Sequence, residues 1–498
     1  MALPANGNSM KLTILMISFF MAAFGAAAWS REPKMKEVRT YMPFNFPVEP
    51  AKIDIIPDMD LSYALAGTLV RWNTNKQITA GLASRWEITN PKTYKFTLPE
   101  SAKWSNGSPI TAQEVKRSFE RSLRTYPEDL RSLANILDHI ETPSERVFEF
   151  HLKITAADSN LLGKLTEPNF GVLMTKDGGA ISLAVSSGPF YLDSATNDEL
   201  VLKKNLHWNM VSSEMADRVV IRRTPPGVES QSVLLNDPWP NLIETSSLIP
   251  GDILQKYEGN RYQVWKRPID KVFLIELGKS VRNEEGFKLL RSLGDNLDRQ
   301  LLTAGLSGFS LATQLFPHGY QLYNPSLQCH RTPAQKSEDK VSRKLNVLIA
   351  QSRISAQLQE NLRKALRSAT GAEPTFAILP LQEAFKRRRT GDFDIYVGTY
   401  GLADPDPEGI MSFYFEGDSP VIASGTDNSV AKLDSARKEP DERKRLTLMQ
   451  AIVGDALCKG HVLPLFHLST VGLGREELDF GSIPTSEESV TLSKIRFK

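Results

Sequence analysis

The chain has 498 residues, of which 41% are apolar and 24% are charged, the composition of an ordinary globular protein. This length is sufficient for two or three domains with sizeable cores. The formal net charge of +2, together with a sequence that carries no nucleic-acid-binding pattern, predicts that nucleic acid is not a partner.

The first predicted element is an export signal in residues 1–28. Lys11 precedes an uncharged, mostly apolar run that ends in Ala26-Ala27-Ala28. A positive residue, an apolar segment and small residues at the end are typical of a secretory signal peptide. An uncleaved membrane anchor is the alternative, but the run is shorter than the span of about 20 residues that a membrane helix needs. We therefore expect cleavage and export.

The region from about residue 40 to residue 270 is rich in predicted strands. Residues 94–98 and 147–154 alternate between apolar and polar side chains, and this period of two is typical of a strand with one buried face. Residues 199–205 and 217–223 predict two strands of one sheet. His151 lies on the polar side of its predicted strand, where we expect it to be solvated.

A tight turn and a capped helix lie between the strands of this region. Asn106-Gly107 supplies the positive φ values that a tight turn needs. Thr111 and Glu114 have the spacing of a capping box, in which each side chain binds the backbone N–H of the other residue. The apolar face of the helix that follows consists of Val115, Phe119 and Leu123.

From residue 271 onward the sequence alternates between strands and helices. The predicted strands are residues 271–278, 344–350, 374–380, 393–401 and 461–468. The predicted helices are residues 286–302, a helix that ends at Gly371, residues 381–389 and residues 441–458. We interpret the basic run Lys386–Arg389 as the solvated end of a helix.

This pattern predicts two lobes. Residues 29–270 and 461–498 form the strand-rich lobe I, which includes a subdomain at about residues 70–185, and residues 271–460 form the α/β lobe II. Two crossovers between the lobes are expected to make a hinge with a cleft.

Seven stretches, in order along the chain, resemble motifs of the family 5 extracellular solute-binding proteins, especially the oligopeptide-binding components of ABC importers. They are residues 48–69, 82–98, 102–115 ("AKWSNGSPITAQEV"), 187–192 with 205–208, 296–302, 392–409 ("DFDIYVGTYGLADPDPEG") and 461–466. The resemblance implies an α/β, two-lobed periplasmic-binding-protein-like fold with a hinge and an interlobe cleft. It also implies that the protein is periplasmic.

The resemblance implies a ligand-contacting segment on each lobe. Asp404 stands where the aspartate of the family faces the cleft and pairs with the α-ammonium of a peptide. Tyr400 and Gly401 precede it, and Gly401 occupies the place of a family tryptophan. The alternative is that Asp404 and Asp406, each followed by proline, only form a turn.

On lobe I, Asp54, Ile55 and Ile56 fall where family members contact the ligand backbone. Glycine is common at the position of Ile55, so this side chain is expected to narrow the pocket.

We expect a protein that binds without chemistry. As the family resemblance implies, it captures peptides and delivers them to an ABC permease, as a monomer. The sequence has no nucleophile–base pair and no Cys/His cluster with metal-ligand spacing, so an enzyme, a cofactor and a metal are not expected. The alternatives are a receptor for another solute, such as a metal chelate or a sugar, and an exported regulatory or chaperone-like protein.

The chain has two cysteines, Cys329 and Cys458. Export to an oxidising compartment permits a disulfide between them. The sequence does not show whether the two residues meet, so both the bonded and the free state stay open.

Overall fold

The computed structural model describes residues 35–53, 56–73, 77–127, 130–224, 237–245, 249–250, 262–307, 309–327, 329, 341–351, 354–401, 407–416, 421–422, 428–439, 441–480 and 492–498. The predicted signal peptide and its cleavage site lie outside these residues. Among the helices in the described ranges, none combines the length and the apolar character that crossing a membrane requires.

The first sheet has four strands in the order β1, β12, β11 and β10. Their bounds are Glu37–Met42, Arg218–Arg223, Glu199–Lys204 and Phe190–Ala195. β1 runs parallel to β12, and the other neighbours are antiparallel. Helix α2 (Ile56–Leu65) packs Leu61 and Leu65 into the apolar core of this sheet. The prediction that residues 199–205 and 217–223 belong to one sheet is confirmed.

A second four-stranded sheet has the order β4, β5, β7 and β6. The bounds are Arg85–Asn90, Thr93–Thr97, Val147–Leu152 and Leu137–Ser144. Phe96, Phe148 and Phe150 are fully buried on one face, where they pack with Phe119 of helix α3 (Ala112–Thr125). Because side chains alternate between the faces of a strand, the residues between these phenylalanines lie on the opposite, polar face.

The predicted turn and capping box are confirmed, although Gly107 has a positive φ and Asn106 does not. Gly107 has a φ of +85°, a conformation that glycine adopts without a steric penalty. The backbone N–H of Glu114 donates to the Thr111 hydroxyl at 3.3 Å, and the backbone N–H of Thr111 donates to the Glu114 carboxylate at 2.8 Å. These two bonds fix the start of α3.

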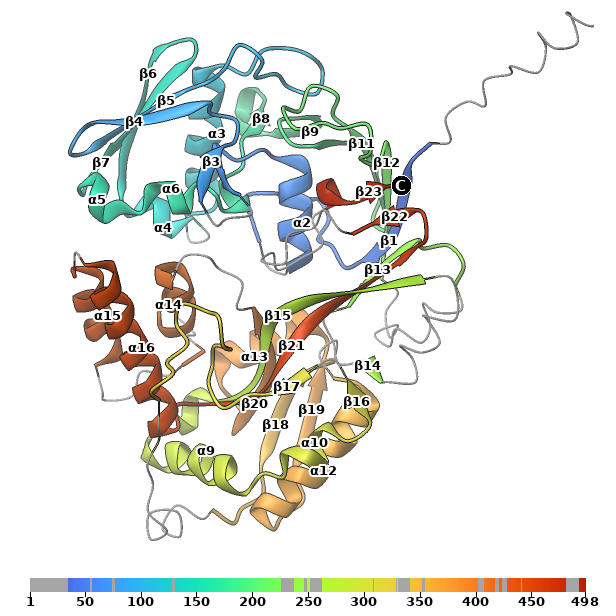
Figure 1. Ribbon diagram of the computed structural model, residues 1–498, viewed down its shortest axis with the longest axis vertical. Helices are drawn as coiled ribbons and strands as arrows, with labels where there is room; N and C mark the ends of the chain where they lie inside the picture. Colours follow the sequence, from blue (N-terminus) through green and yellow to red (C-terminus); the bar gives the residue numbers. More distant parts are fainter. Residues whose placement is uncertain are drawn as a thin grey trace, which may run out of the picture. The chain divides into compact units, whose positions relative to one another are not determined.

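The largest sheet places two long antiparallel strands, β15 and β21, side by side (Figure 1). Its strand order is β13, β21, β15, β20, β18 and β19, and β17 also pairs with β21. The bounds are Leu242–Thr245, Val462–Arg475, Tyr262–Leu277, Ile395–Gly401, Asn346–Ala350, Thr375–Leu379 and Phe309–Leu311. β18 is parallel to both β19 and β20, as the alternation of strands and helices predicts.

Helices cover both faces of this sheet. α9 (Glu284–Asn296) and α12 (Ala356–Thr370) share one core with Phe273 and Ile275 of β15. α14 (Pro407–Phe415), α15 (Ser429–Arg437) and α16 (Glu442–Lys459) share another core with Val272 and Leu274. Because both of its faces are buried there, the end of β15 from Val272 to Leu277 reads as an apolar run interrupted only by Glu276.

The prediction of a single helix over residues 286–302 is wrong in one respect, because the structure has two helices there. Leu297 has an extended ψ of 120°, and a second helix, α10, spans Arg299–Thr303. Asp298 caps α10, since its Oδ1 accepts from the backbone N–H groups of Gln300 and Leu301 at 3.0 and 2.9 Å. An aspartate stabilises a helix more when it caps the first turn than when it lies in the interior of the helix.

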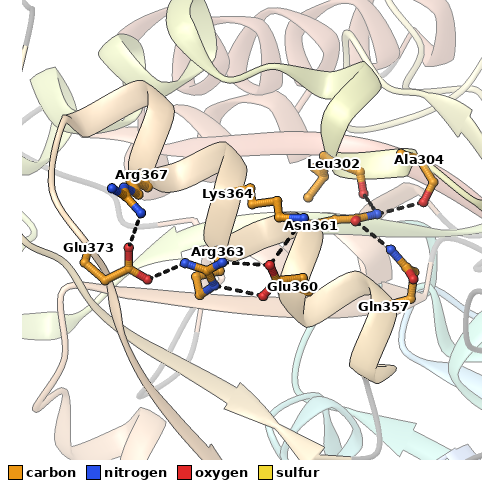
Figure 2. A network of polar contacts seen from close by, with 9 residues as sticks. All are labelled: Leu302, Ala304, Gln357, Glu360, Asn361, Arg363, Lys364, Arg367 and Glu373. Carbon is orange, nitrogen blue, oxygen red and sulfur yellow. Dashed lines mark hydrogen bonds and ion pairs between the residues drawn. The ribbon is translucent and has the colours of Figure 1, made fainter.

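A buried amide on α12 holds α10 in place (Figure 2). Asn361 is 3% exposed, and its Nδ2 donates to Leu302 O at 3.1 Å and to Ala304 O at 2.8 Å. Its Oδ1 accepts from Gln357 at 2.9 Å. The last carbonyls of α10 therefore find partners in a side chain instead of water.

Asn241 connects the first sheet to the largest one. Its side chain accepts from Arg39 N at 2.7 Å and donates to Glu37 O at 2.8 Å. Its own carbonyl accepts from Arg475 N at 3.0 Å. At 3% exposure, Asn241 makes one hydrogen-bonded link between β1 and the end of β21.

The division of the chain into lobes stays a prediction. Leu463, Leu465, Phe466 and Leu468 of β21 pack in the same core as α9 and α12. This packing favours a C-terminal boundary of lobe II that lies beyond residue 460.

A disulfide joins Cys329 to Cys458 of α16, with the two Cα atoms 5.0 Å apart. The pairing that the sequence left open is therefore made, across 129 residues of chain.

The remaining elements are short, except for α13, which is Leu381–Thr390. The strands are β2 (Val70–Trp72), β3 (Ile78–Ala80), β8 (Leu173–Thr175), β9 (Ile181–Ser186), β14 (Ile249–Pro250), β16 (Leu306–Ser307), β22 (Leu478–Asp479) and β23 (Arg496–Phe497). The helices are α4 (Arg131–Ala134), α5 (Ala156–Ser159), α6 (Leu161–Lys164) and the 3-10 turns η1 (Pro168–Phe170), η2 (Asp177–Gly179), η3 (Lys279–Val281) and η5 (Leu492–Lys494).

Candidate functional site

Three of the six predicted site residues are described. Tyr400 and Gly401 are the last two residues of β20, and Ile56 is the first residue of α2. Asp404, Asp54 and Ile55 lie outside the described residues. Tyr400 and Gly401 share one strand, whereas Ile56 begins a helix of a different core.

The end of β20 is built by its pairing with β15. Tyr400 lies opposite Val272, and Gly401 lies opposite Lys271, which is 1% exposed. The carbonyl of Gly401 accepts a hydrogen bond from the Tyr414 hydroxyl of α14 at 3.2 Å. Strand and helix together therefore fix the backbone at the point where the chain continues toward Asp404.

A buried ionic cluster lies beside this strand end. Glu276 of β15 has no exposed surface, and its carboxylate binds the guanidinium of Arg388 on α13 through both oxygens. The Tyr400 hydroxyl donates to Glu276 Oε1 at 2.7 Å, and Arg282 Nη2 lies 3.9 Å from Oε2. A buried carboxylate is stable only when paired and hydrogen-bonded in this way.

The cluster shifts the pKa of each of its donors. Burial and the neighbouring Glu276 raise the pKa of Tyr400 well above its usual value, so the phenol keeps its proton and donates. Burial opposes the charge of Arg388, but Tyr400 and Glu276 raise its pKa, so the guanidinium stays charged. Burial lowers the pKa of Arg282, although Glu276 acts in the opposite direction.

Three aromatic rings meet at the same place. The centroid of Tyr400 lies 6.1 Å from that of Phe413 and 6.3 Å from that of Tyr414. Phe413 is 54% exposed, although it is a large apolar residue on a short helix. Because the Tyr400 hydroxyl is bound to Glu276, its ring is held in a fixed position next to an exposed apolar surface.

The interpretation of Lys386–Arg389 as a solvated helix end is wrong for Arg388. The helix exists, but the side chain of Arg388 is only 12% exposed, because Glu276 lies under it. The sequence analysis also missed Glu276. The available signal is one carboxylate in the otherwise apolar stretch from Val272 to Leu277, which calls for a buried cation.

The described residues include one group with the chemistry of metal ligands. It consists of His139, Glu141 and His151 on β6 and β7. His151 has a side chain that is 25% exposed, so it is less solvated than expected.

Comparisons with known proteins agree on one family. Residues 77–235 match the model of the bacterial extracellular solute-binding proteins, family 5 (middle). The chain is 26% identical over 392 residues to "Probable D,D-dipeptide-binding periplasmic protein DdpA" of Escherichia coli, a match that covers 72% of this chain and 73% of that protein.

Two solved structures are similar over nearly the whole chain. NikA from Brucella suis in complex with Fe(III)-EDTA has a TM-score of 0.76 and 18% identity, covering 93% of this chain and 100% of that one. The ABC transporter-associated periplasmic binding protein DppA from Helicobacter pylori, in complex with peptide STSA, has a TM-score of 0.76 and 15% identity, covering 93% and 98%. The fold is therefore the α/β, two-lobed fold of the periplasmic binding proteins, as the sequence predicts.

Proposed function

The chain belongs to the family 5 bacterial extracellular solute-binding proteins, and from this premise we propose that it captures peptides and delivers them to an ABC permease. The observation that carries the proposal is the match over 72% of the chain to a protein named for binding D,D-dipeptides. The same fold holds the peptide STSA in DppA.

The proposed mechanism is binding without a chemical step. An extended peptide lies in the cleft between the two lobes and adds main-chain hydrogen bonds to both of them. The segment Asp54–Ile56 provides such bonds on lobe I, and the chain after Gly401 provides them on lobe II. Closure of the lobes about the hinge then buries the peptide.

Asp404 is the proposed anchor for the peptide ammonium. A carboxylate in a closed site is costly unless it is paired, so it favours a ligand with a cation at that point. The described residues next to Asp404 in the sequence support its proposed role as the anchor. Gly401, three residues before Asp404, is fixed by β15 and by the hydroxyl of Tyr414, and the rings of Tyr400 and Phe413 lie next to it.

The proposal includes export and a partner. Cleavage of residues 1–28 releases the protein into the periplasm, where it acts as a monomer and docks on a permease. The disulfide between Cys329 and Cys458 is compatible with an oxidising compartment.

A second candidate is a receptor for a metal chelate. NikA, described with Fe(III)-EDTA, has the same TM-score to this chain as the peptide-bound DppA. The fold alone therefore does not separate the two ligands, and a test must use ligands of both kinds.

Calorimetry on a pair of peptides tests the ammonium anchor. Asp404→Asn should weaken the binding of free-amine peptides by at least about 2 kcal/mol, because removing one member of a buried charge pair strands the other. N-acetylated peptides should bind the parent protein poorly, and the substitution should matter little for them. The four combinations form a double-mutant cycle that isolates the pair.

Asp406→Asn is the matched control, since Asp406 also precedes a proline but is expected only to form a turn. It should leave peptide affinity nearly unchanged. A coupling energy near zero for Asp404, with free and acetylated peptides bound alike, would remove Asp404 as the anchor. Binding of a metal chelate without any binding of peptides would favour the second candidate.

A further inference from the structure

A cluster of metal-ligand side chains lies on the polar face of the β4–β5–β7–β6 sheet. β6 and β7 are antiparallel neighbours (Figure 1), and their pairing sets His139 opposite His151 and Glu141 opposite Glu149. Residues two apart on a strand share a face, so all four side chains lie on the same side of the sheet. The opposite face carries the buried phenylalanines.

The two imidazoles converge on one carboxylate. His139 Nε2 lies 3.3 Å from Glu141 Oε1, and His151 Nε2 lies 3.6 Å from Glu141 Oε2. The rings are stacked, with centroids 4.3 Å apart and planes within 4° of parallel. One ligand atom from each of the three residues lies within 4.8 Å of the other two.

These separations suit a tetrahedral metal site. Zinc binds histidine nitrogen and carboxylate oxygen at about 2.0–2.2 Å, which places neighbouring tetrahedral ligands roughly 3.3–3.6 Å apart. The observed separations of 3.3 and 3.6 Å are close to this spacing. Because a metal bound to Nε2 lies in the plane of the imidazole, at least one of the two stacked rings must rotate out of the stack to bind the same ion. Glu149 Oε2, 3.6 Å from His151 Nε2, or a water molecule would supply the fourth ligand.

Both histidines have a second contact of the kind that orients a metal ligand. His139 Nδ1 lies 2.9 Å from Asp138 Oδ2, and His151 Nδ1 lies 3.2 Å from the hydroxyl of the buried Thr93. Metal-binding histidines usually donate their other ring N–H to a carboxylate or another oxygen, and this fixes the tautomer. Here Asp138 and Thr93 occupy the Nδ1 atoms, which leaves each Nε2 directed at Glu141.

His151 Nε2 is the atom that a purely structural role does not explain. It is inaccessible to solvent and has no hydrogen-bond partner. A protonated His139 that bridges Asp138 and Glu141 would explain the position of the His139 ring without a metal. It would not explain His151, whose Nε2 lies 3.6 Å from the carboxylates of Glu141 and Glu149 and forms a hydrogen bond with neither. A buried polar atom without a partner is costly, and a metal ion would satisfy it.

We propose that His139, Glu141 and His151 bind a divalent transition-metal ion of the zinc type, on a different sheet from Tyr400 and separately from the peptide site. Two nitrogen ligands and one or two carboxylates suit zinc, nickel or copper, whereas calcium and magnesium require oxygen ligands. The ion would cross-link β6 to β7 and so stabilise this sheet.

Calorimetric titration of the untagged, full-length protein with Zn²⁺ tests the site. The parent protein should bind one ion, and Ca²⁺ should not bind there. His139→Ala, His151→Ala and Glu141→Gln should each weaken Zn²⁺ binding by at least about tenfold, since they remove a direct ligand. His318→Ala, at an exposed histidine outside the cluster, is the matched control and should leave the affinity unchanged.

Asp138→Asn and Thr93→Val test the two positioning residues. Each should weaken Zn²⁺ binding roughly tenfold, because it removes a contact that orients a ligand. Melting curves without metal serve as the folding control. Zn²⁺ should raise the melting temperature of the parent and of His318→Ala but not that of His151→Ala.

Anomalous diffraction from Zn²⁺-soaked crystals of the parent protein needs no variant. A zinc peak beside both Nε2 atoms would support the site. Failure of the parent to bind Zn²⁺, equal affinity in the three ligand variants, or a zinc peak only elsewhere on the protein would overturn the proposal.

Discussion

Two clusters of glutamate and arginine differ mainly in their exposure to water. Glu276 is fully buried and binds Arg388, whose side chain is 12% exposed. Glu360 on α12 is 43% exposed and binds Arg363, which also binds Glu373 (Figure 2). Both glutamates accept two hydrogen bonds from one guanidinium, so the local chemistry is the same.

The difference shows that a shifted pKa is not by itself a measure of stability. The hydrogen bonds from Arg363 lower the pKa of Glu360 to about 2, yet water surrounds this pair and screens it. The buried pair has lost its water, so each charge depends on the other. We therefore expect Glu276 to matter for the fold and for the position of Tyr400, and Glu360 to matter little for either.

The largest expected effect is that of Glu276→Gln. The substitution keeps the shape but leaves the buried charge of Arg388 uncompensated, so the free energy of unfolding should fall by about 3–5 kcal/mol. Urea denaturation measures this change. In the double variant with Arg388→Met the charge of Arg388 is no longer stranded, although that of Arg282 still lacks its carboxylate, so part of the stability should return. A loss below about 1 kcal/mol in the single variant would mean that the pair is not buried in solution.

Asn361→Ala should have the next largest effect. Asn361 lies on the same helix as the exposed pair but is buried, and its loss strands the carbonyls of Leu302 and Ala304. The expected cost is about 1–3 kcal/mol, the range for buried polar groups left without a partner. Thermal unfolding checks it, with Gln357→Ala as the comparison. If the variant were as stable as the parent protein, burial of Asn361 would not determine how much stability its hydrogen bonds contribute on this helix.

An intermediate pair, Glu416 and Arg437, should show an intermediate and pH-dependent effect. Their side chains are 27% and 25% exposed, with hydrogen bonds of 2.7 and 2.9 Å. The hydrogen bonds from Arg437 lower the pKa of Glu416 below its ordinary value of 4.5. The stabilisation is therefore present above about pH 4.5 and is lost as the pH falls through the lowered pKa of the folded state.

Arg437→Gln should thus cost about 1 kcal/mol at neutral pH and progressively less in acid. Denaturation of both proteins over a range of pH checks this. A cost that stays constant into acid would show that Arg437 acts through packing and not through its charge pair with Glu416.

The smallest expected effect is that of Glu360→Gln. Despite the low pKa of Glu360, we expect no measurable change in the free energy of unfolding, because the pair is solvated. Urea denaturation at low and high salt checks this. A clear destabilisation that salt removes would show that the network with Arg363 and Glu373 is stronger than exposure suggests.

Local signals in the sequence predicted much of the fold. The Thr111 and Glu114 capping box, the end of α12 at Gly371 and the pairing of residues 199–204 with 218–223 depend on short stretches of chain. The sequence does not indicate the helix break at Leu297, because apolar residues continue at helical spacing through it. The opposing signal is Asp298, which caps the start of the next helix.

Contacts between distant residues could not be predicted. Glu276 and Arg388 are 112 residues apart, and Cys329 and Cys458 are 129 residues apart. The partners of each residue depend on how β15, α13 and α16 pack, which no local pattern encodes. For the ligand site, the resemblance alone supplied Asp404, Asp54 and Ile55, and these residues stay predictions. The sequence indicates Tyr400 only as an aromatic neighbour of Asp404, whereas the structure shows its hydrogen bond to Glu276.

Native mass spectrometry of the protein purified from the cells that naturally produce it tests the central claim most directly. The account predicts adducts with the masses of short peptides, which disappear when the protein is unfolded and return when free-amine peptides are added back. Adducts with the mass of a metal chelate, or a ligand-free protein to which no peptide adds, would contradict the claim that this solute-binding protein is a peptide receptor.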